Sequence, residues 1–145
     1  MTNDIFKYPV HVTWGDCDPA QIVYTGHIPG FALKAIDGWW EHHLDGDGWF
    51  QMEMDRGYGT PFVHMSFDFR SPITPRHRLI CSVAPVRLGT SSIEFRVVGR
   101  QDNVVCFEGR FVCVFVIAGK LRPRPAPDDV RVMIAPLLLA ADAEI

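Results

Sequence analysis

The sequence predicts an α+β fold in which one long helix is wrapped by a curved antiparallel sheet. A stripe of apolar residues at helical spacing between Ile28 and His43 is the evidence for the helix. After Gly57 the period changes to an alternation of apolar and polar residues, and short turns separate the alternating runs, which indicates an antiparallel sheet. A chain of 145 residues is most simply one domain, 1–145, built on one core.

The composition excludes several classes of protein. A formal net charge of −3 at pH 7 does not fit a general nucleic-acid binder, so we expect no nucleic acid as a partner. No apolar run approaches the roughly 20 residues of a membrane span, and the first residues lack the basic and apolar pattern of a secretory signal. The four cysteines show neither a CxxC pair nor the spacing of a zinc site. We therefore expect a cytoplasmic protein with no membrane contact and no metal.

The first strand is expected over Phe6 to Trp14, where alternation places Val10, Val12 and Trp14 on one face. Pro9 would lie at the start or the edge of this strand, because its missing N–H costs little there. The strand then leads into an acidic loop.

That loop, residues 14–24, reads WGDCDPAQIVY. Asp and Gly favour turns, and Pro19 pushes Asp18 toward an extended backbone, so Asp16 and Asp18 could both be turn or capping residues and nothing more. The alternative is functional, since an acidic side chain beside the N–H groups of a helix start suits chemistry on a carbonyl. Cys17 has no histidine in an obvious relation to it, so there is no reason to expect a reactive thiolate.

The long helix is expected over Ile28 to His43, where the apolar residues recur at the spacing of one buried stripe. Pro29 falls in the first turn, where a missing N–H is tolerated. Gly38 lies inside the helix and costs about 1 kcal/mol relative to alanine, so we expect it to pack closely against the sheet. Residues Leu44 to Gly48 form the turn that ends the helix.

The second half of the chain supplies most of the sheet. Trp49 to Arg56 is expected to form a short second helix or an irregular cover. The strand that follows, Gly59 to Ile73, alternates as a long half-buried strand, and short turns connect it and the later strands into an antiparallel meander. Asp128 and Asp129 open a C-terminal helix in a tail from about residue 126. The three later strands are expected at Arg78–Arg87, Ser91–Arg100 and Val104–Ala118.

One such unit leaves a sheet edge and part of the helix exposed. An exposed edge presents unpaired backbone groups, so we expect two copies to pair edge to edge into a continuous sheet. The expected partner is a second copy of the chain, in a homodimer or a dimer-of-dimers tetramer.

The loop from Trp14 to Tyr24 resembles the signature of hotdog-fold acyl-CoA thioesterases of the 4-hydroxybenzoyl-CoA thioesterase type. The distance in sequence from this loop to the expected long helix is also similar to that in the family. Further similarity lies in Gly59-Thr60-Pro61 before a strand, in Phe67–Pro72 and in Gly89–Ser92. The resemblance runs from Tyr8 to Val132, nearly the whole chain. It implies a hotdog fold and hydrolysis of a small or aromatic acyl-CoA, with CoA as part of the substrate and no cofactor.

The resemblance also implies roles for particular residues. Asp18 matches the catalytic carboxylate, which attacks the thioester carbonyl directly or activates a water. The backbone N–H of Thr25 matches the donor that polarises the thioester oxygen, and Tyr24 precedes it in the expected catalytic set. Asp16 then supports the turn, and Cys17 has no role.

Substrate contacts are implied at Thr60 and Pro61, and CoA contacts at Arg87 and Ser91. The sequence departs from the family pattern in the loop, where Thr25 replaces an aromatic residue or histidine and Gln21 replaces a common glycine, and at two places that concern the substrate. Leu33 lies where the 4-hydroxybenzoyl enzyme has an acid, and the two residues that follow Arg87 are not basic. None of these departures touches Asp18.

Two other functions stay open at this point. In a sister group of thioesterases and in hotdog dehydratases the carboxylate lies on the helix, where Asp37 and Glu41 are the candidates. A hotdog domain that binds acyl-CoA or a partner protein without catalysis is the other alternative.

Overall fold

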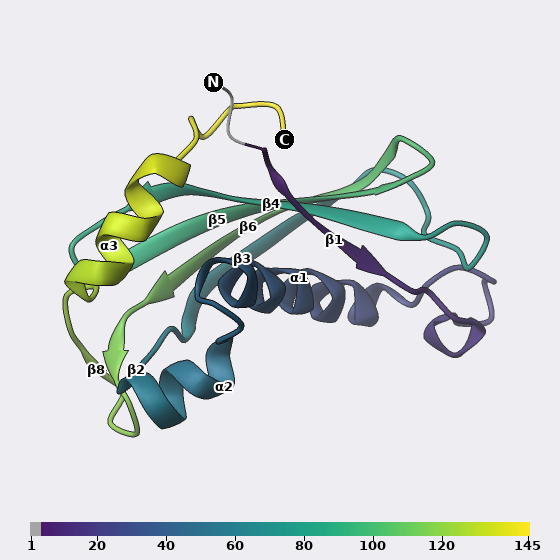
Figure 1. The fold of residues 1–145 in the computed structure, drawn as a ribbon. Helices are drawn as coiled ribbons and strands as arrows, with labels where there is room; N and C mark the ends of the chain where they lie inside the picture. The colour runs from purple at the N-terminus through teal and green to yellow at the C-terminus, as the bar shows by residue number, and fades with distance from the viewer. Residues whose placement is uncertain (1–3) are drawn as a thin grey trace.

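The computed structural model describes residues 4–145 and confirms the predicted α+β fold. An antiparallel sheet of five strands, in the order β1-β4-β5-β6-β3, curves around helix α1 (Ile28–His43), as Figure 1 shows. A small sheet in the order β2-β7-β8 lies beyond one end of the helix. The strands are β1 (Phe6–Val10), β2 (Tyr58–Gly59), β3 (Phe62–Phe69), β4 (Leu79–Leu88), β5 (Ser92–Gln101), β6 (Val104–Val114), β7 (Val116–Ile117) and β8 (Arg122–Pro123).

The helices lie where the sequence predicts them. Helix α1 has the predicted bounds and follows directly on a 3₁₀ turn, Thr25–His27. The short second helix is α2 (Trp49–Gln51), which continues into a π-helical turn, Met52–Arg56. The C-terminal helix α3 (Asp128–Ile134) begins at the predicted aspartate pair and covers one end of the sheet (Figure 1).

The tail beyond α3 packs against the outer face of the sheet. Ile145 is buried in a small cluster with Ala84 of β4 and Val98 of β5. The Arg96 guanidinium donates a hydrogen bond to the Ala143 carbonyl. The end of the chain thereby covers apolar positions on the outer face, opposite the face that packs on α1.

The predicted meander holds for β4, β5 and β6 and is wrong for β3, which lies at the far edge beside β6. The connection from β3 to β4 therefore crosses to the other side of the sheet. Gln101 anchors this connection, because its Nε2 donates to the carbonyls of Thr74 and His77 at 2.7 and 2.6 Å. Its Oε1 accepts the Thr74 N–H at 3.0 Å. Gln101, whose sequence neighbourhood is typical of a turn, is thus a buried amide that provides hydrogen bonds to backbone groups of the connection from β3 to β4.

The first strand is shorter than predicted. It ends at Val10, and Trp14, expected on the same face as Val10 and Val12, is 70% exposed in a 3₁₀ turn at Trp14–Asp16, whereas those two valines are buried. The cause is local, because the Asp16 carboxylate accepts the Thr13 backbone N–H at 2.8 Å and turns the chain out of the strand direction.

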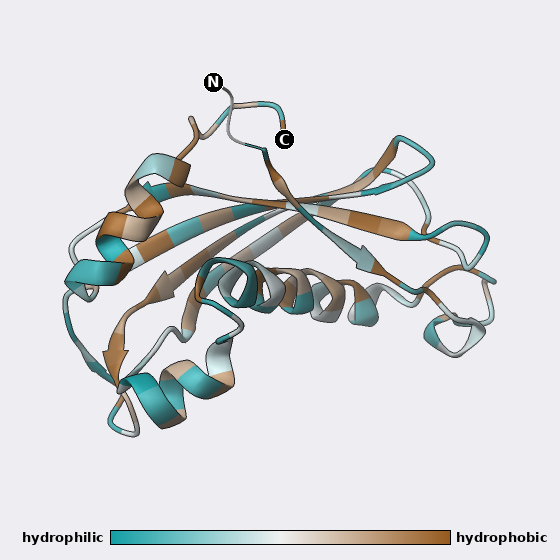
Figure 2. Cartoon of the chain, in the orientation of Figure 1, coloured by the Kyte–Doolittle hydropathy of each residue, from teal (hydrophilic) through white to brown (hydrophobic). Residues whose placement is uncertain are grey.

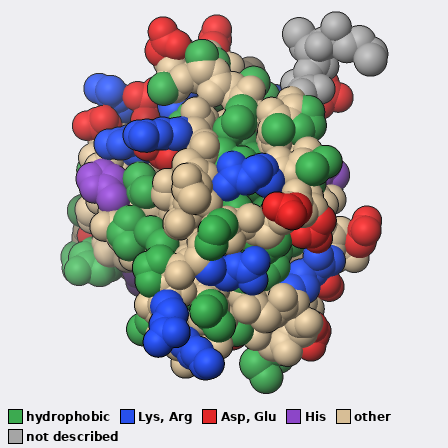
Figure 3. All heavy atoms as spheres, turned by 90° about the vertical axis from the view of Figure 1, so that its left-hand side faces the viewer, with side chains coloured by type: hydrophobic (Ala, Val, Ile, Leu, Met, Phe, Trp, Pro, Cys, Tyr) green, Lys and Arg blue, Asp and Glu red, His purple; other side chains and the backbone are tan. Residues whose placement is uncertain are grey.

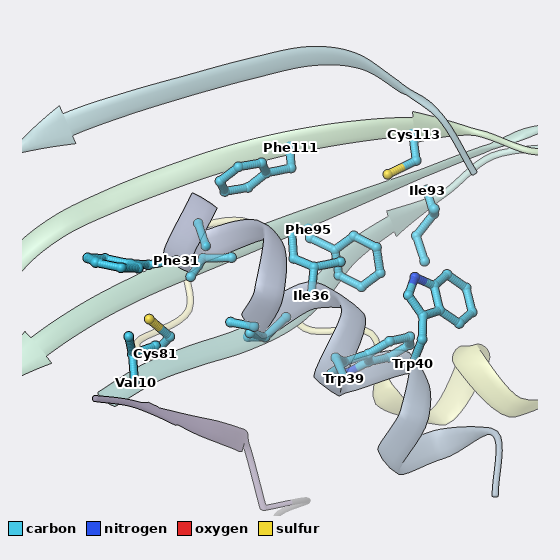
Figure 4. Close-up of a cluster of buried hydrophobic side chains, with 14 of the residues drawn as sticks. Val10, Phe31, Ile36, Trp39, Trp40, Cys81, Ile93, Phe95, Phe111 and Cys113 are labelled. Atoms are coloured by element: carbon cyan, nitrogen blue, oxygen red, sulfur yellow. The ribbon is translucent and has the colours of Figure 1, made fainter. Parts of the chain in front are cut away.

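The core lies between α1 and the concave face of the sheet. Trp39 and Trp40 of α1 pack against Phe95 of β5, with ring centroids 5.0 and 6.0 Å apart, as Figure 4 shows. In Figure 2 hydrophobic segments alternate with hydrophilic ones along the strands above α1, whereas the turns between strands are mostly hydrophilic. The apolar stripe predicted for the helix is therefore buried as expected.

Gly38 lies where α1 packs closely against strand β1, and Gly30 on the same helix is its natural control. A Cβ at Gly38 would lie 2.6 Å from Cδ1 of Tyr8 in β1, whereas a Cβ at Gly30 would meet nothing within 4 Å. We expect Gly30→Ala to stabilise the protein by about 0.5 kcal/mol through helix propensity alone. Gly38→Ala should destabilise it, because the Tyr8 ring must move. Urea denaturation of both variants checks the opposite signs, and a stabilising Gly38→Ala would contradict the close packing.

Strand β3 is an edge strand whose apolar side chains are largely exposed. The prediction of a half-buried strand is wrong here: Val63, Met65 and Phe69 are open to solvent, and Phe69 is 51% exposed. Only Phe62 and Phe67 of this strand pack against the core. An exposed apolar edge of this kind is a ready surface for pairing with another strand.

Candidate active site

The acidic loop is a small hairpin closed by its own backbone. The Tyr24 N–H donates to the Asp16 carbonyl at 2.9 Å, and the Asp18 N–H donates to the Ile22 carbonyl at 3.0 Å. Between these bonds, Cys17 and Val23 form an antiparallel bridge. The loop is therefore held in one conformation, and its second strand leads straight to the start of the helix.

Asp18 opens the tight turn at the tip of this hairpin. Its carbonyl accepts the Gln21 N–H at 2.8 Å, and Gln21 has a φ of +68°, in the left-handed region that favours glycine. The Asp18 Oδ1 accepts the Ala20 N–H at 2.8 Å, and its Oδ2 has no partner within residues 4–145. The half-buried carboxylate is thus oriented by one oxygen and leaves the other free for chemistry.

Asp16 supports the turn, in the role that the sequence assigns to it. Its Oδ2 accepts both the backbone N–H and the hydroxyl of Thr13, at 2.8 and 3.1 Å. Chiefly because of the Thr13 backbone N–H, the pKa of Asp16 is lower than usual, with smaller contributions from the Thr13 hydroxyl and from His27. The His27 Nδ1 lies 3.5 Å from the Asp16 Oδ1. Two neighbouring acids of one loop therefore have different environments.

Thr25 is the first residue of the 3₁₀ turn that runs into α1. The first N–H groups of a helix have no acceptor inside it, and in the described part of the chain Thr25 and Gly26 have none elsewhere either. The aligned peptide dipoles of α1 add positive potential at this end. Thr25 also lines a hollow of about 260 Å³ with Ile22, Ile28 and Phe69. The arrangement suits an oxygen that gains negative charge.

Tyr24, the remaining predicted catalytic residue, is exposed. Its ring stands edge-on against the His27 ring, with centroids 5.6 Å apart. Its backbone N–H is already bonded to Asp16, so this N–H is not free for a substrate.

Thr60 and Pro61 line a second, larger cavity of about 620 Å³ beside α2. Its other lining residues include Leu33, Trp49 and Glu53. Thr60 Oγ1 and Trp49 Nε1 are buried without a hydrogen-bond partner among the residues described. The Glu53 carboxylate accepts the Gly119 N–H at 2.6 Å across 66 residues of sequence. Sequence reasoning missed Trp49 and Glu53, since only the fold brings them beside Thr60.

Arg87 does not lie in either of these cavities. It lines a hollow on the outer face of the sheet together with Glu94, Arg96 and Arg110. The carbonyl of Ser91 accepts the Phe115 N–H at 2.7 Å, next to the β4–β5 turn. One chain by itself therefore does not bring the four predicted substrate-binding residues together, and the CoA contacts at Arg87 and Ser91 stay predictions.

The end of the molecule formed by α3 and β8 carries several Lys and Arg side chains. Figure 3 shows them separated by hydrophobic and neutral groups instead of gathered in one patch. Some are used within the fold: Arg131 donates to the carbonyls of Gly89 and Thr90, both at 2.9 Å. Arg124 donates to the Pro125 carbonyl at 3.0 Å.

The helix carboxylates of the alternative mechanism have different surroundings. Asp37 Oδ1 accepts the Trp49 N–H at 2.8 Å and so holds the start of α2. Glu41 is exposed on the same helix. Among residues 4–145 no three His, Cys, Asp or Glu side chains converge as metal ligands. Within the same range no helix is long and apolar enough to cross a membrane.

The cysteines divide into one half-exposed thiol and three buried ones. Burial raises the pKa of Cys81 and of Cys113 to about 12. Cys17, in the hairpin, is half-buried. We therefore expect iodoacetamide to label Cys17 first in the folded protein, as measured by peptide mass spectrometry. Earlier labelling of Cys81 or Cys113 would contradict this order, and denatured protein is the control in which all four should react.

Comparison with known proteins gives a consistent family. The Thioesterase-like superfamily matches residues 12–134. A thioesterase-superfamily structure from Jannaschia sp. CCS1 is 54% identical over 96% of each chain, with a TM-score of 0.92. A 1,4-dihydroxy-2-naphthoyl-CoA thioesterase from Synechocystis is 18% identical, with a TM-score of 0.79, over 90% of this chain and 96% of that one. A thioesterase from Thermus thermophilus, complexed with coenzyme A and Zn, is 22% identical, with a TM-score of 0.76, over 90% and 92%. No curated protein sequence matches.

The fold of one long helix in a curved antiparallel sheet, shared with these structures, is that of the hotdog-fold enzymes. The chain belongs to the thioesterase-like superfamily, and by that membership it is a thioester hydrolase. The predicted family is thereby confirmed. The roles of Asp18 and Thr25 within it stay predictions.

Proposed function

We propose that the protein hydrolyses a small or aromatic acyl-CoA, with Asp18 as nucleophile or general base and the Thr25 backbone N–H as oxyanion donor. One observation carries this proposal. The carboxylate lies on a rigid hairpin that leads within a few residues to helix N–H groups without an acceptor. A carboxylate and an oxyanion donor are the two groups that acyl transfer from a thioester requires.

The chemistry follows one of two routes. If the Asp18 carboxylate attacks the carbonyl carbon, the C–S bond breaks, CoA leaves as a thiolate, and water hydrolyses the resulting anhydride. If Asp18 takes a proton from water, the hydroxide attacks, and the C–S bond breaks in the same way. Both routes end in a carboxylic acid and the CoA thiol. In both, the Thr25 N–H stabilises the tetrahedral oxyanion, and one such donor contributes about 3 kcal/mol.

We propose further that the active form is a homodimer paired through β3. Antiparallel pairing of two β3 edges brings the Phe62 end of one strand beside the Phe69 end of the other. Phe69 lines the hollow of Thr25, and Phe62 lines the cavity of Thr60. The two halves of the predicted site, which lie apart in one chain, would then meet across the interface. The pairing would also cover the exposed apolar side chains of β3.

The substrate class draws support from the relatives. One is a dihydroxynaphthoyl-CoA thioesterase, and another was crystallised with coenzyme A. The cavity beside Thr60 is largely lined by apolar side chains, including Leu33, Trp49 and Phe62, which suits an acyl chain or a ring.

The test is a panel of acetyl-, hexanoyl-, benzoyl- and 4-hydroxybenzoyl-CoA, followed by detection of free thiol. We expect release of CoA from at least one member by the wild type and none above background by Asp18→Ala. Thermal shift with the same panel runs in parallel. Binding without thiol release would overturn the proposal in favour of a non-catalytic acyl-CoA-binding domain.

A further inference from the structure

We infer that His27 is a positioning residue, which holds the first turn of the helix against the acidic hairpin and so fixes the Thr25 N–H relative to Asp18. The role deepens the proposed function and holds only if that function does. His27 lies outside the residues that the sequence marks as catalytic. It acts through Asp16 and Tyr24, not on the substrate.

The first step is the contact between His27 and Asp16. The two oxygens of the Asp16 carboxylate have different partners. Oδ2 accepts hydrogen bonds from the backbone N–H and the hydroxyl of Thr13, and Oδ1 lies 3.5 Å from His27 Nδ1. One carboxylate thus contacts both Thr13, just before the hairpin, and His27, in the 3₁₀ turn that leads into α1. The His27 side chain is 45% exposed, and its Nδ1 faces this carboxylate oxygen of the hairpin.

The second step is the packing around Gly26, the residue between Thr25 and His27. The Tyr24 ring lies over Gly26 so closely that a Cβ there would come within 2.5 Å of Tyr24 Cε2. The His27 ring packs against the same Tyr24 ring and stands nearly perpendicular to it, with an interplanar angle of 79°. Tyr24, Gly26 and His27 therefore pack as one unit around the Thr25 peptide, and Asp16 ties this unit to the hairpin.

The third step is what the chemistry requires. An oxyanion donor works only if it lies at hydrogen-bond distance from the oxygen that the attack creates, so its place relative to Asp18 matters. Apart from the His27 contact, the hairpin and the 3₁₀ turn are joined by the backbone bond from Tyr24 N–H to Asp16. The His27–Asp16 contact, two residues beyond Thr25, is a second link between the two elements and would restrict the tilt of the turn. A misplacement of 1 Å can cost about 100-fold in rate.

The experiment compares three substitutions at this position. His27→Ala removes the contact, and His27→Phe keeps a ring against Tyr24 but has no N–H. His27→Asn places an amide Nδ2 at the same number of bonds from the backbone as the imidazole Nδ1, so it keeps the donor. We expect Ala and Phe to lower kcat about 10- to 100-fold with KM within about twofold, and Asn to remain close to wild type. The substrate is the fastest member of the acyl-CoA panel.

Thr13→Val is the matched control, because it removes a hydrogen bond from the same carboxylate on the side away from the helix. It should keep wild-type kcat. The inference is overturned if Ala and Phe keep full activity, or if Asn falls as far as Ala. Thermal melting identifies a variant that loses activity by unfolding, and in that case the folded pair of Phe and Asn decides. A different result would contradict the proposed function: full activity of Asp18→Ala. If hydrolysis depends on Asp18 but the His27 substitutions have no effect, only the positioning role of His27 is contradicted.

Discussion

Asp18→Asn is expected to lower kcat by about 10³-fold while KM stays near its wild-type value. Asparagine retains the Oδ1 that accepts the Ala20 N–H, so the turn at the tip of the hairpin should keep its shape. What it loses is the negative charge, and with it the capacity to attack a carbonyl or to accept a proton from water. An interaction made only in the transition state affects kcat and not KM. Thiol release under saturating and limiting acyl-CoA measures both constants.

Glu41→Gln is the control for this experiment. It makes the same change of carboxylate to amide on the exposed surface of α1, where the alternative mechanism places its acid. We expect kcat unchanged. The reverse result, an active Asp18→Asn and an inactive Glu41→Gln, would move the catalytic carboxylate to the helix. Size-exclusion chromatography of all proteins separates a loss of chemistry from a loss of assembly.

Elements set by local pattern could be predicted well from the sequence. The apolar stripe and Pro29 in the first turn define α1, and the observed helix has the predicted ends at Ile28 and His43. Asp128 likewise marks the start of α3. Helix periodicity and first-turn chemistry depend on residues only a few positions apart, so they are readable without tertiary information.

Features that depend on distant residues could not be predicted in the same way. Alternation identifies β3 as a strand but carries no information about its neighbour, so its place beside β6 at the sheet edge came only from the fold. Trp14 has the right parity for a buried strand position, yet the bond from Thr13 N–H to Asp16 ends the strand before it. A local capping interaction prevailed over hydrophobic alternation there.

The candidate site shows the same division. Asp18 and Thr25 could be predicted as site residues from the sequence, because both belong to one short segment that resembles a family signature. The Glu53 carboxylate accepts a hydrogen bond from the Gly119 N–H, which is distant in the sequence, and no sequence motif predicts this pair. His27 reads in the sequence as one more polar residue before a helix. Its contact with Asp16 appears only when the hairpin closes.

Trp40→Ala is expected to cost about 3–5 kcal/mol of unfolding free energy, the largest stability effect that we predict. Trp40 is fully buried, and it links three parts of the core. Its ring centroid lies 5.0 Å from Trp39, 6.0 Å from Phe95 and 6.4 Å from Phe115. Figure 4 shows it between α1 and the sheet. Alanine would leave a cavity that the surrounding rings and strands cannot close.

Trp40→Phe separates the two consequences of that change. The Trp40 Nε1–H is buried with no acceptor in the described region, and an unpaired buried donor costs about 1–3 kcal/mol. Phenylalanine removes this donor while it keeps most of the ring volume, so its net cost should be well below that of alanine. Trp14→Ala is the exposed control, expected within about 0.5 kcal/mol of wild type. Urea denaturation followed by circular dichroism, at one fixed protein concentration because a dimer unfolds with concentration dependence, ranks the three. Equal costs for Trp40→Ala and Trp14→Ala would mean that α1 does not pack on the sheet through Trp40.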